Sequence, residues 1–234
     1  AGVRELERFI GSIIRKTIKK ILMTKTKKLD VTSATLEELI GKPRYENTKV
    51  VDEDLVGVVN GLAYTEFGGD TLEIEATYYA GSGALILTGN LGDVMKESAQ
   101  AALSYVKSHA ENLNIDPTMF KQNDIHIHVP EGAVPKDGPS AGVTLTTAIV
   151  SALSNKKVHH EIGMTGEVTL RGRVLPIGGL REKSIAANRN GLKTILIPSE
   201  NMKDIDEIPV TVKDQLQIIP VKTVEEVIDM AIIK

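Results

Sequence analysis

The 234-residue sequence contains no cysteine and no tryptophan, and aromatic residues make up only 3% of it. The absence of cysteine excludes disulfides, a thiolate nucleophile and a cysteine-ligated zinc site. It also fits a reducing compartment, so we expect a cytoplasmic protein. The formal net charge of −3 argues against nucleic acid as the main ligand of the whole chain. Nucleic acid is therefore a conceivable partner but not an indicated one.

Signals for membrane insertion, secretion and nucleotide binding are also missing. No uncharged apolar run approaches the roughly 18 residues that a membrane span requires, so we expect no membrane partner. The first residues interleave apolar and charged side chains, unlike a signal peptide, and the lack of an initiator Met leads us to expect an upstream domain. No Gly-x-x-x-x-Gly-Lys-Ser/Thr motif occurs, so we expect no cofactor in this segment.

The first 43 residues are predicted to form a small helical unit. Apolar residues recur at helical spacing from Ala1 to Lys25. The opposite face carries a basic run, which is more typical of a solvated helix face than of nucleic-acid contact. A second helix is expected from near Thr35, with Glu38 completing a capping box, to a stop at Gly41.

Residues 44–50 are mostly polar and are interpreted as a linker, and residues 51–234 are predicted to form the main domain. Runs rich in β-branched residues alternate with helical segments along this domain. The expected strands include Val56–Val59, Thr71–Tyr79, Ala84–Thr88 and Ile125–Val129, and a helix is expected at Asp93–His109. This alternation predicts a mixed α/β fold.

The segment Glu131–Gly142 carries the strongest candidate for a nucleophile. It follows an expected strand and opens a helix, and no charged residue occurs from Pro139 to Asn155. Such a helix should be buried on most sides, and Pro139 suits its first turn. Ser140 would then lie at the helix start, where free backbone N–H groups can stabilise an oxyanion. The alternative is that Ser140 only caps the helix.

The same segment matches G-x-S-x-G, the nucleophile-elbow pattern. An α/β-hydrolase, however, needs an acid and then a histidine after the serine. The last histidines here are His159 and His160, and no Asp lies between Ser140 and them. His126 and His128 precede the serine and lie two apart on an expected strand, so they share one face. Either could serve a Ser–His pair, although exposed strand residues are the plainer interpretation.

The second informative segment runs from Met164 to Lys183 and supplies a candidate base. It is interpreted as a hairpin with its turn near Arg171-Gly172, followed by a Gly-Gly entry into a helix. On that helix Lys183 shares a face with small and apolar residues. Because burial disfavours the charged amine, such a lysine can accept a proton from Ser140. By spacing alone, a lysine with its charge in solvent would look the same.

Together the two segments resemble the signatures of Lon proteases: PKDGPSAG around the serine, and MTGEVTLRGRVLPIGGLREK leading to the lysine. The resemblance implies that Ser140 is the catalytic serine and Lys183 the catalytic lysine. It also implies that Thr165 helps to hold the lysine, that Asp137 is the acidic residue just before the serine, and that Glu75 lines the site. The resemblance covers essentially the whole chain. Further family-like segments are Gly57–Ala63, Leu87–Gly89 and Gly92–Ser98.

The N-terminal residues 1–8 resemble the sensor-2 helix in the small helical subdomain of Lon's ATPase module, which implies that Arg4 approaches the nucleotide phosphates. The resemblance further implies a Lon-type proteolytic domain, with mixed β-sheets and packed helices, preceded by a fragment of that subdomain. It implies an ATP-dependent endopeptidase of unfolded or damaged proteins, with ATP and Mg²⁺ bound by the full-length protein and six chains forming a homohexamer.

The sequence leaves two alternatives to this function open. One is a catalytically silent scaffold of the same fold, which would need neither Ser140 nor Lys183. The other is the Ser–His hydrolase that uses His126 or His128. For a peptidase, we expect an extended substrate to pair with the strand edge Val134–Lys136.

Overall fold

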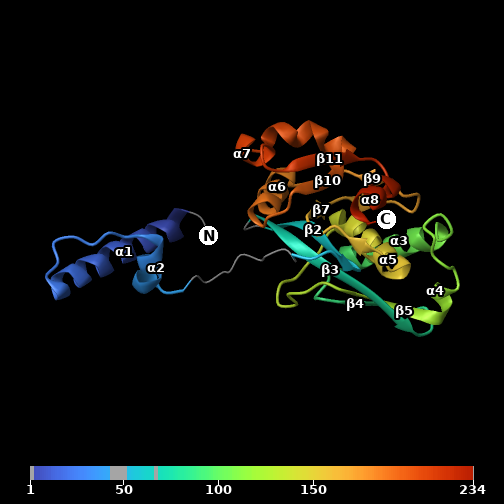
Figure 1. The fold of residues 1–234 in the computed structure, drawn as a ribbon, viewed down its shortest axis with the longest axis horizontal. Coiled ribbons are helices and arrows are strands. Elements are labelled where there is room, and N and C mark those ends of the chain that lie inside the picture. The colour runs from blue at the N-terminus through green and yellow to red at the C-terminus, as the bar shows by residue number, and fades with distance from the viewer. Residues whose placement is uncertain (1–2, 43–51, 66–67, 234) are drawn as a thin grey trace. The chain divides into compact units, whose positions relative to one another are not determined.

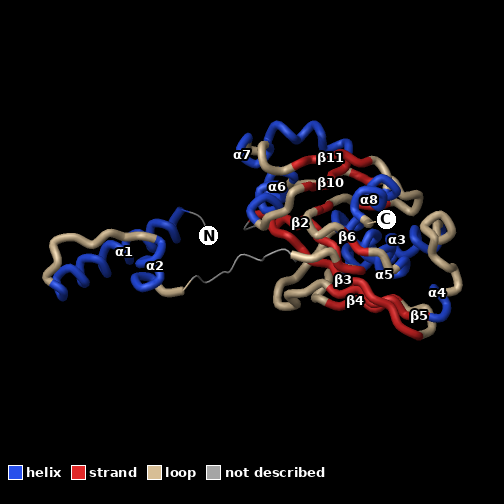
Figure 2. Tube along the Cα trace, viewed as in Figure 1, coloured by secondary structure: helices blue, strands red, loops and turns tan. Residues whose placement is uncertain are grey.

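The computed structural model describes residues 3–42, 52–65 and 68–233. The chain divides into two compact units, Ala1–Asn47 and Thr48–Lys234 (Figure 1, Figure 2). The expected linker at residues 44–50 lies outside the described residues, so the domain boundaries stay a prediction.

The described residues of the N-terminal unit form two helices, α1 (Val3–Thr24) and α2 (Ser33–Ile40). The predicted cap lies one turn too late, because α2 begins after Thr32, whose N–H donates to Thr35 Oγ1 at 2.9 Å. Glu38 instead forms an ion pair with Lys20, with 2.6 Å between Nζ and Oε1. Periodicity predicts that a helix exists more firmly than it predicts where the helix begins. Here Thr32 and Thr35 offer similar hydroxyl groups for the cap.

The main unit is built on a seven-stranded mixed sheet, which confirms the predicted α/β class. In spatial order its strands are β11 (Gln217–Val221), β10 (Thr194–Pro198), β7 (Ile162–Met164), β2 (Val58–Thr65), β3 (Gly68–Ala80), β5 (Asn123–His128) and β4 (Leu85–Thr88). β3 runs antiparallel to β2 and β5, and the other neighbours are parallel. Two short antiparallel pairs are β1 (Leu55–Val56) with β6 (Lys157–Val158), and β8 (Glu167–Val168) with β9 (Val174–Leu175). The β8–β9 pair confirms the predicted hairpin.

The predicted strand Val56–Val59 is interrupted at Gly57. This residue has a φ of +75°, and a Cβ there would lie 2.2 Å from the carbonyl oxygen of Ala76. Only glycine accepts both the left-handed backbone and this close approach, so the chain bends between β1 and β2. The local residue pattern carries no information about Ala76, which is why the sequence predicts one continuous strand.

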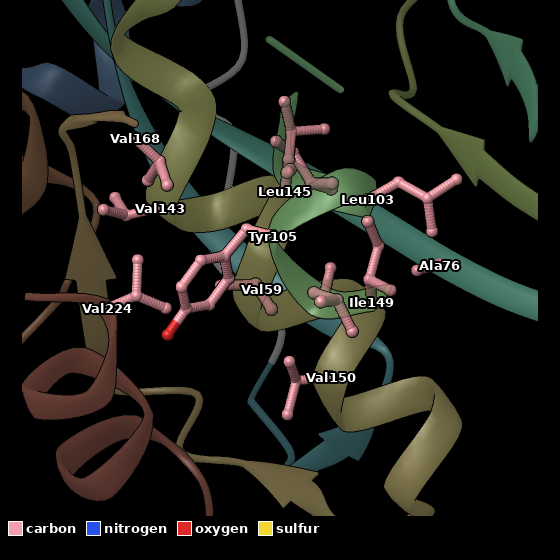
Figure 3. Packing of buried hydrophobic residues seen from close by; sticks show 14 of the residues in the cluster. Val59, Ala76, Leu103, Tyr105, Val143, Leu145, Ile149, Val150, Val168 and Val224 are labelled. Carbon is pink, nitrogen blue, oxygen red and sulfur yellow. The ribbon is translucent and has the colours of Figure 1, made fainter. Parts of the chain in front are cut away.

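Helices cover both faces of the sheet (Figure 1). On one face lies α5 (Gly142–Ser154), with α3 (Asp93–Ser108) packed against it; Figure 3 shows their core around Tyr105 and Ile149. Every residue from Gly142 to Leu153 is buried, as the absence of charge predicts. The opposite face carries α6 (Leu180–Arg189), which packs on Leu62. The remaining helices are α4 (Met119–Gln122), η1 (Pro139–Ala141), η2 (Ser199–Glu207), α7 (Val210–Lys213) and α8 (Val224–Ala231).

Candidate active site

Ser140 lies in a single 3₁₀ turn, η1, immediately before α5. Pro139 opens this turn, where its missing N–H loses no hydrogen bond. Gly142 begins α5 close to the β8 backbone, and a Cβ at this position would lie 2.7 Å from the Val168 nitrogen. The Gly166 N–H donates to the Ser140 carbonyl oxygen at 2.8 Å. The residues PSAG therefore place a partly exposed serine beside the segment that follows β7.

Lys183 reaches this serine from α6, on the opposite face of the sheet from α5. Its Nζ lies 3.1 Å from Ser140 Oγ and 3.0 Å from Thr165 Oγ1. The helix approaches β3 closely because residue 69 is a glycine; a Cβ on Gly69 would lie 2.0 Å from the Glu182 carbonyl oxygen. Two segments 43 residues apart in sequence thus bring a hydroxyl and an amine within hydrogen-bond distance.

Burial changes the acid–base behaviour of this amine. The Lys183 side chain is 2% exposed, and this loss of hydration lowers its pKa to about 8. With that pKa, roughly one lysine in ten is neutral at pH 7, whereas an ordinary lysine is almost wholly protonated. A neutral amine beside a serine hydroxyl can accept its proton.

Thr165 fixes the direction of the lysine. This residue is fully buried directly after β7, and its hydroxyl donates to the Ser140 carbonyl oxygen at 3.3 Å. Because the one hydroxyl hydrogen is used there, the oxygen lone pairs face Lys183 Nζ and accept from it. The threonine therefore ties the serine backbone and the lysine side chain to the same point.

The sequence of the chain matches two models of known protein families. Residues 30–234 match the Lon protease (S16) C-terminal proteolytic domain. The chain belongs to the Lon protease family. Residues 1–40 match the Lon protease AAA+ ATPase lid domain, so the N-terminal unit has a counterpart in the same family.

Relatives are similar to this chain along its whole length. The Lon protease of Desulforamulus reducens is 53% identical over 234 residues, Lon protease 1 of Bacillus subtilis 55% over 233, and the Lon protease of Mycoplasma mycoides 58% over 230. These matches cover 98% to 100% of this chain but only 29% to 30% of each relative. The chain thus spans less than a third of the length of these Lon proteases.

Asp137, the acidic residue before the serine in the Lon signature, lies against α3. Its Oδ1 accepts hydrogen bonds from the N–H of Met95 and from that of Gly138, both at 2.9 Å. Met95 is the third residue of α3, so the carboxylate caps the positive end of this helix. In this conformation Asp137 positions the chain before Ser140. A direct effect of Asp137 on Ser140 or Lys183 stays a prediction.

Glu75 lies on β3 in the Lon proteolytic domain, exposed to solvent beside Glu73. Burial, together with a hydrogen bond and the like charge of Glu75, raises the pKa of Glu73 above its usual range. Among the described residues, no hydrogen bond or ion pair joins Glu75 to Lys183. The structure therefore places Glu75 outside the Ser140–Lys183–Thr165 group, and its part in catalysis stays a prediction.

The two histidines that could have formed a Ser–His pair have a different partner. Thr88 Oγ1 lies 2.9 Å from His126 Nε2 and 2.7 Å from His128 Nδ1. Both rings share one face of β5, as predicted, but their hydroxyl partner is a threonine of β4 rather than Ser140. This contact argues against the Ser–His alternative.

The strand edge expected to receive substrate is closed in this conformation. The N–H of Val134 donates to the Glu131 carbonyl oxygen at 3.0 Å, and that of Lys136 donates to the Asn90 carbonyl oxygen at 3.1 Å. Pro135, between them, has no N–H. The segment uses these donors for its own turn and for the β4–α3 junction, so the pairing of substrate along Val134–Lys136 stays a prediction.

The sequence gives no signal for Asn201, which holds the entry to α6. This side chain, 1% exposed, accepts from the Ile177 N–H at 2.9 Å and donates to the Ile177 carbonyl oxygen at 2.8 Å. Its amide also donates to Asp204 Oδ2 at 2.8 Å. Because Ile177 precedes the Gly-Gly entry to α6, Asn201 fixes where the lysine-bearing helix begins.

The last candidates concern the nucleotide, a metal ion and a membrane. Arg4 is exposed on α1 of the N-terminal unit. Within the described part of the chain, no three His, Cys, Asp or Glu side chains are placed to hold a metal ion. No described helix is both long enough and apolar enough to cross a membrane.

Proposed function

We propose that this chain is the peptide-cutting part of an ATP-dependent Lon protease, with Ser140 as nucleophile and Lys183 as general base. The observation that carries the proposal is the 3.1 Å contact between Lys183 Nζ and Ser140 Oγ, made by a lysine whose burial lowers its pKa to about 8. A structural serine that only caps a helix has no need of a buried amine at its hydroxyl.

The mechanism follows from the positions of the three side chains. Neutral Lys183 accepts the proton of Ser140, and the serine oxygen attacks the substrate carbonyl carbon. Backbone N–H groups of the η1 turn stabilise the oxyanion of the tetrahedral intermediate. Lys183 then donates its proton to the leaving amine, and the acyl-enzyme forms. In the second half Lys183 activates a water molecule, which releases the acyl group, while Thr165 keeps the amine in place.

The wider setting of this activity also rests on the family. We propose unfolded or damaged proteins as substrates, a homohexameric ring as the assembly, and the cytoplasm as the location. ATP and Mg²⁺ would be bound by the full-length protein, with Arg4 at the nucleotide phosphates. The match of residues 1–40 to the AAA+ ATPase lid domain supports this part of the proposal.

Intact-mass analysis after treatment with a serine acylating agent or a peptide boronate tests the nucleophile. We expect one adduct on Ser140 in the unaltered chain and none after Ser140→Ala. An adduct that survives Ser140→Ala would contradict the assignment. A folded chain that takes no adduct would favour the silent scaffold, and loss of activity after replacement of both His126 and His128 would favour the Ser–His hydrolase.

A further inference from the structure

Lys136, four residues before the nucleophile, is a buried cation with a full set of acceptors. The residue is 9% exposed. Its Nζ donates to the carbonyl oxygens of Glu131, Val134 and Gly89 at 2.6, 3.2 and 3.3 Å. An ammonium group has three N–H donors, so each one has a backbone acceptor. Burying a charge is costly unless its hydrogen bonds are satisfied, and here backbone carbonyl groups satisfy all three.

These contacts close the segment before Ser140 around its own lysine. Glu131 adopts a φ of +63°, an uncommon value for a residue other than glycine. Its carbonyl oxygen accepts both the Val134 N–H and the Lys136 ammonium, which together hold this turn. Burial lowers the pKa of Lys136, and the nearby charge of Glu131 partly opposes that effect. The Lys136 side chain therefore supplies one of the two donors that hold the turn.

The same residue ties the turn to the β4–α3 junction. The Lys136 N–H donates to the Asn90 carbonyl oxygen at 3.1 Å, and its carbonyl oxygen accepts the Gly92 N–H at 2.8 Å. The next residue, Asp137, accepts the Met95 N–H at 2.9 Å. Adjacent residues of opposite charge thus bind carbonyl and N–H groups of one junction, and the serine turn begins two residues later.

We infer that Lys136 is a positioning residue that holds Ser140 at hydrogen-bond distance from Lys183. Gly166 and the buried helix α5 fix the serine from its C-terminal side. From the N-terminal side, the chain is held by the Lys136 ammonium and the Asp137 carboxylate. Without the ammonium, the turn at Glu131 keeps only the hydrogen bond from the Val134 N–H, and the position of Ser140 is less firmly fixed. Because a misplacement of about 1 Å can cost ~10²-fold in rate, the acylation step should be the one affected.

This inference rests on the proposed function, and the absence of cysteine provides a direct test. The variant Lys136→Cys carries a single thiol, which can be alkylated in denaturant before refolding. Bromoethylamine restores an ammonium group at the length of lysine, whereas bromopropane adds a neutral group of the same shape. The two forms therefore differ in charge and N–H donors, and hardly in size. Lys193→Cys, at an exposed lysine, receives both treatments as the matched control.

Acylation of Ser140 by a peptide-based acylating probe is measured against probe concentration. We expect the propyl form to acylate at least ~10-fold more slowly at saturation, with the half-saturating concentration changed by less than about threefold. The aminoethyl form should return to within about threefold of the unaltered chain, and both Lys193 forms should match it. Equal rates for the propyl and aminoethyl forms at position 136 would overturn the inference.

Hydrogen exchange at the Gly92 and Met95 amides gives a second readout that does not depend on activity. In the propyl form both amides should exchange at least ~10-fold faster than in the aminoethyl form, because the tie to Lys136 and Asp137 is loosened. Unchanged exchange would refute the tie even if acylation slowed. If the unaltered chain took no probe, the proposed function would fail. Hydrogen exchange would still show whether Lys136 holds the β4–α3 junction. Should the propyl form not refold, carbamoylmethylation supplies a neutral group with N–H donors and an expected intermediate exchange rate.

Discussion

At the residue scale, the central feature is a buried lysine whose lowered pKa suits the base proposed for Ser140. Lys183→Arg keeps a positive charge, but a guanidinium does not deprotonate at accessible pH. Cleavage of a fluorogenic peptide should therefore fall by at least ~10²-fold, the low end for loss of a general base. In the unaltered chain the rate should rise with pH, about tenfold per unit below the pKa of about 8, and then level off. Near-normal turnover by folded Lys183→Arg, or a flat profile from pH 6 to 9, would contradict a lysine base.

The same burial should make Lys183 reduce the stability of the fold. The folded pKa of about 8 lies below the ordinary value of 10.5, so the unfolded chain binds more protons between these values and stability rises with pH there. Below pH 8 the cost is fully present. Lys183→Met should therefore raise the free energy of unfolding at pH 7 by up to about 3 kcal/mol, less what Ser140 and Thr165 lose as partners. Urea titrations from pH 7 to 10.5 should show this gain shrinking; a gain that did not change with pH would disprove the linkage.

At the element scale, the sequence predicts what depends on local pattern and misses what depends on distant packing. The uncharged run after Pro139 predicts the buried helix α5, and the Gly-Gly pair predicts the start of α6, as the structure shows. The break at Gly57 and the amide clamp of Asn201 involve partners remote in sequence, so no local pattern could indicate them. The Ser140–Lys183 contact joins opposite faces of a sheet. The residue pattern offers Lys183 as a candidate base for Ser140, and the family resemblance favours that pair over the alternatives.

The clamp on Ile177 offers a test of how an element is held in place. Asn201→Ala removes both partners of the Ile177 backbone, so the free energy of unfolding should fall by roughly 1 to 2 kcal/mol. The control Asn112→Ala removes an exposed amide and should stay within about 0.5 kcal/mol. Urea denaturation of both variants provides the measurement. If the two variants proved equally stable, Asn201 would not fix the entry to α6.

At the scale of the whole molecule, the site depends on convergence of two layers. α5 and the serine turn cover one face of the sheet, α6 covers the other, and Thr165 joins them directly after β7. We therefore expect the Ser140–Lys183 contact to form only when the main unit has folded. Ser140, Lys183 and Thr165 all lie in the unit Thr48–Lys234. Peptide cleavage should accordingly need the main unit alone.

This division predicts what the chain can and cannot degrade. ATP hydrolysis requires a phosphate-binding loop, a lysine on the terminal phosphates and a metal site, and the sequence contains no motif for such a loop. Unfolding a stable domain requires roughly 5–15 kcal/mol, and we expect that the chain cannot draw this energy from a nucleotide. An unstructured peptide should therefore be cleaved at the same rate with or without ATP and Mg²⁺, whereas a tagged, tightly folded domain should resist in both conditions. Gel and mass analysis of the two substrates gives the answer. ATP-stimulated degradation of the folded domain by the purified chain would mean that a nucleotide site exists within these 234 residues, and the proposed separation of cutting from unfolding would be wrong.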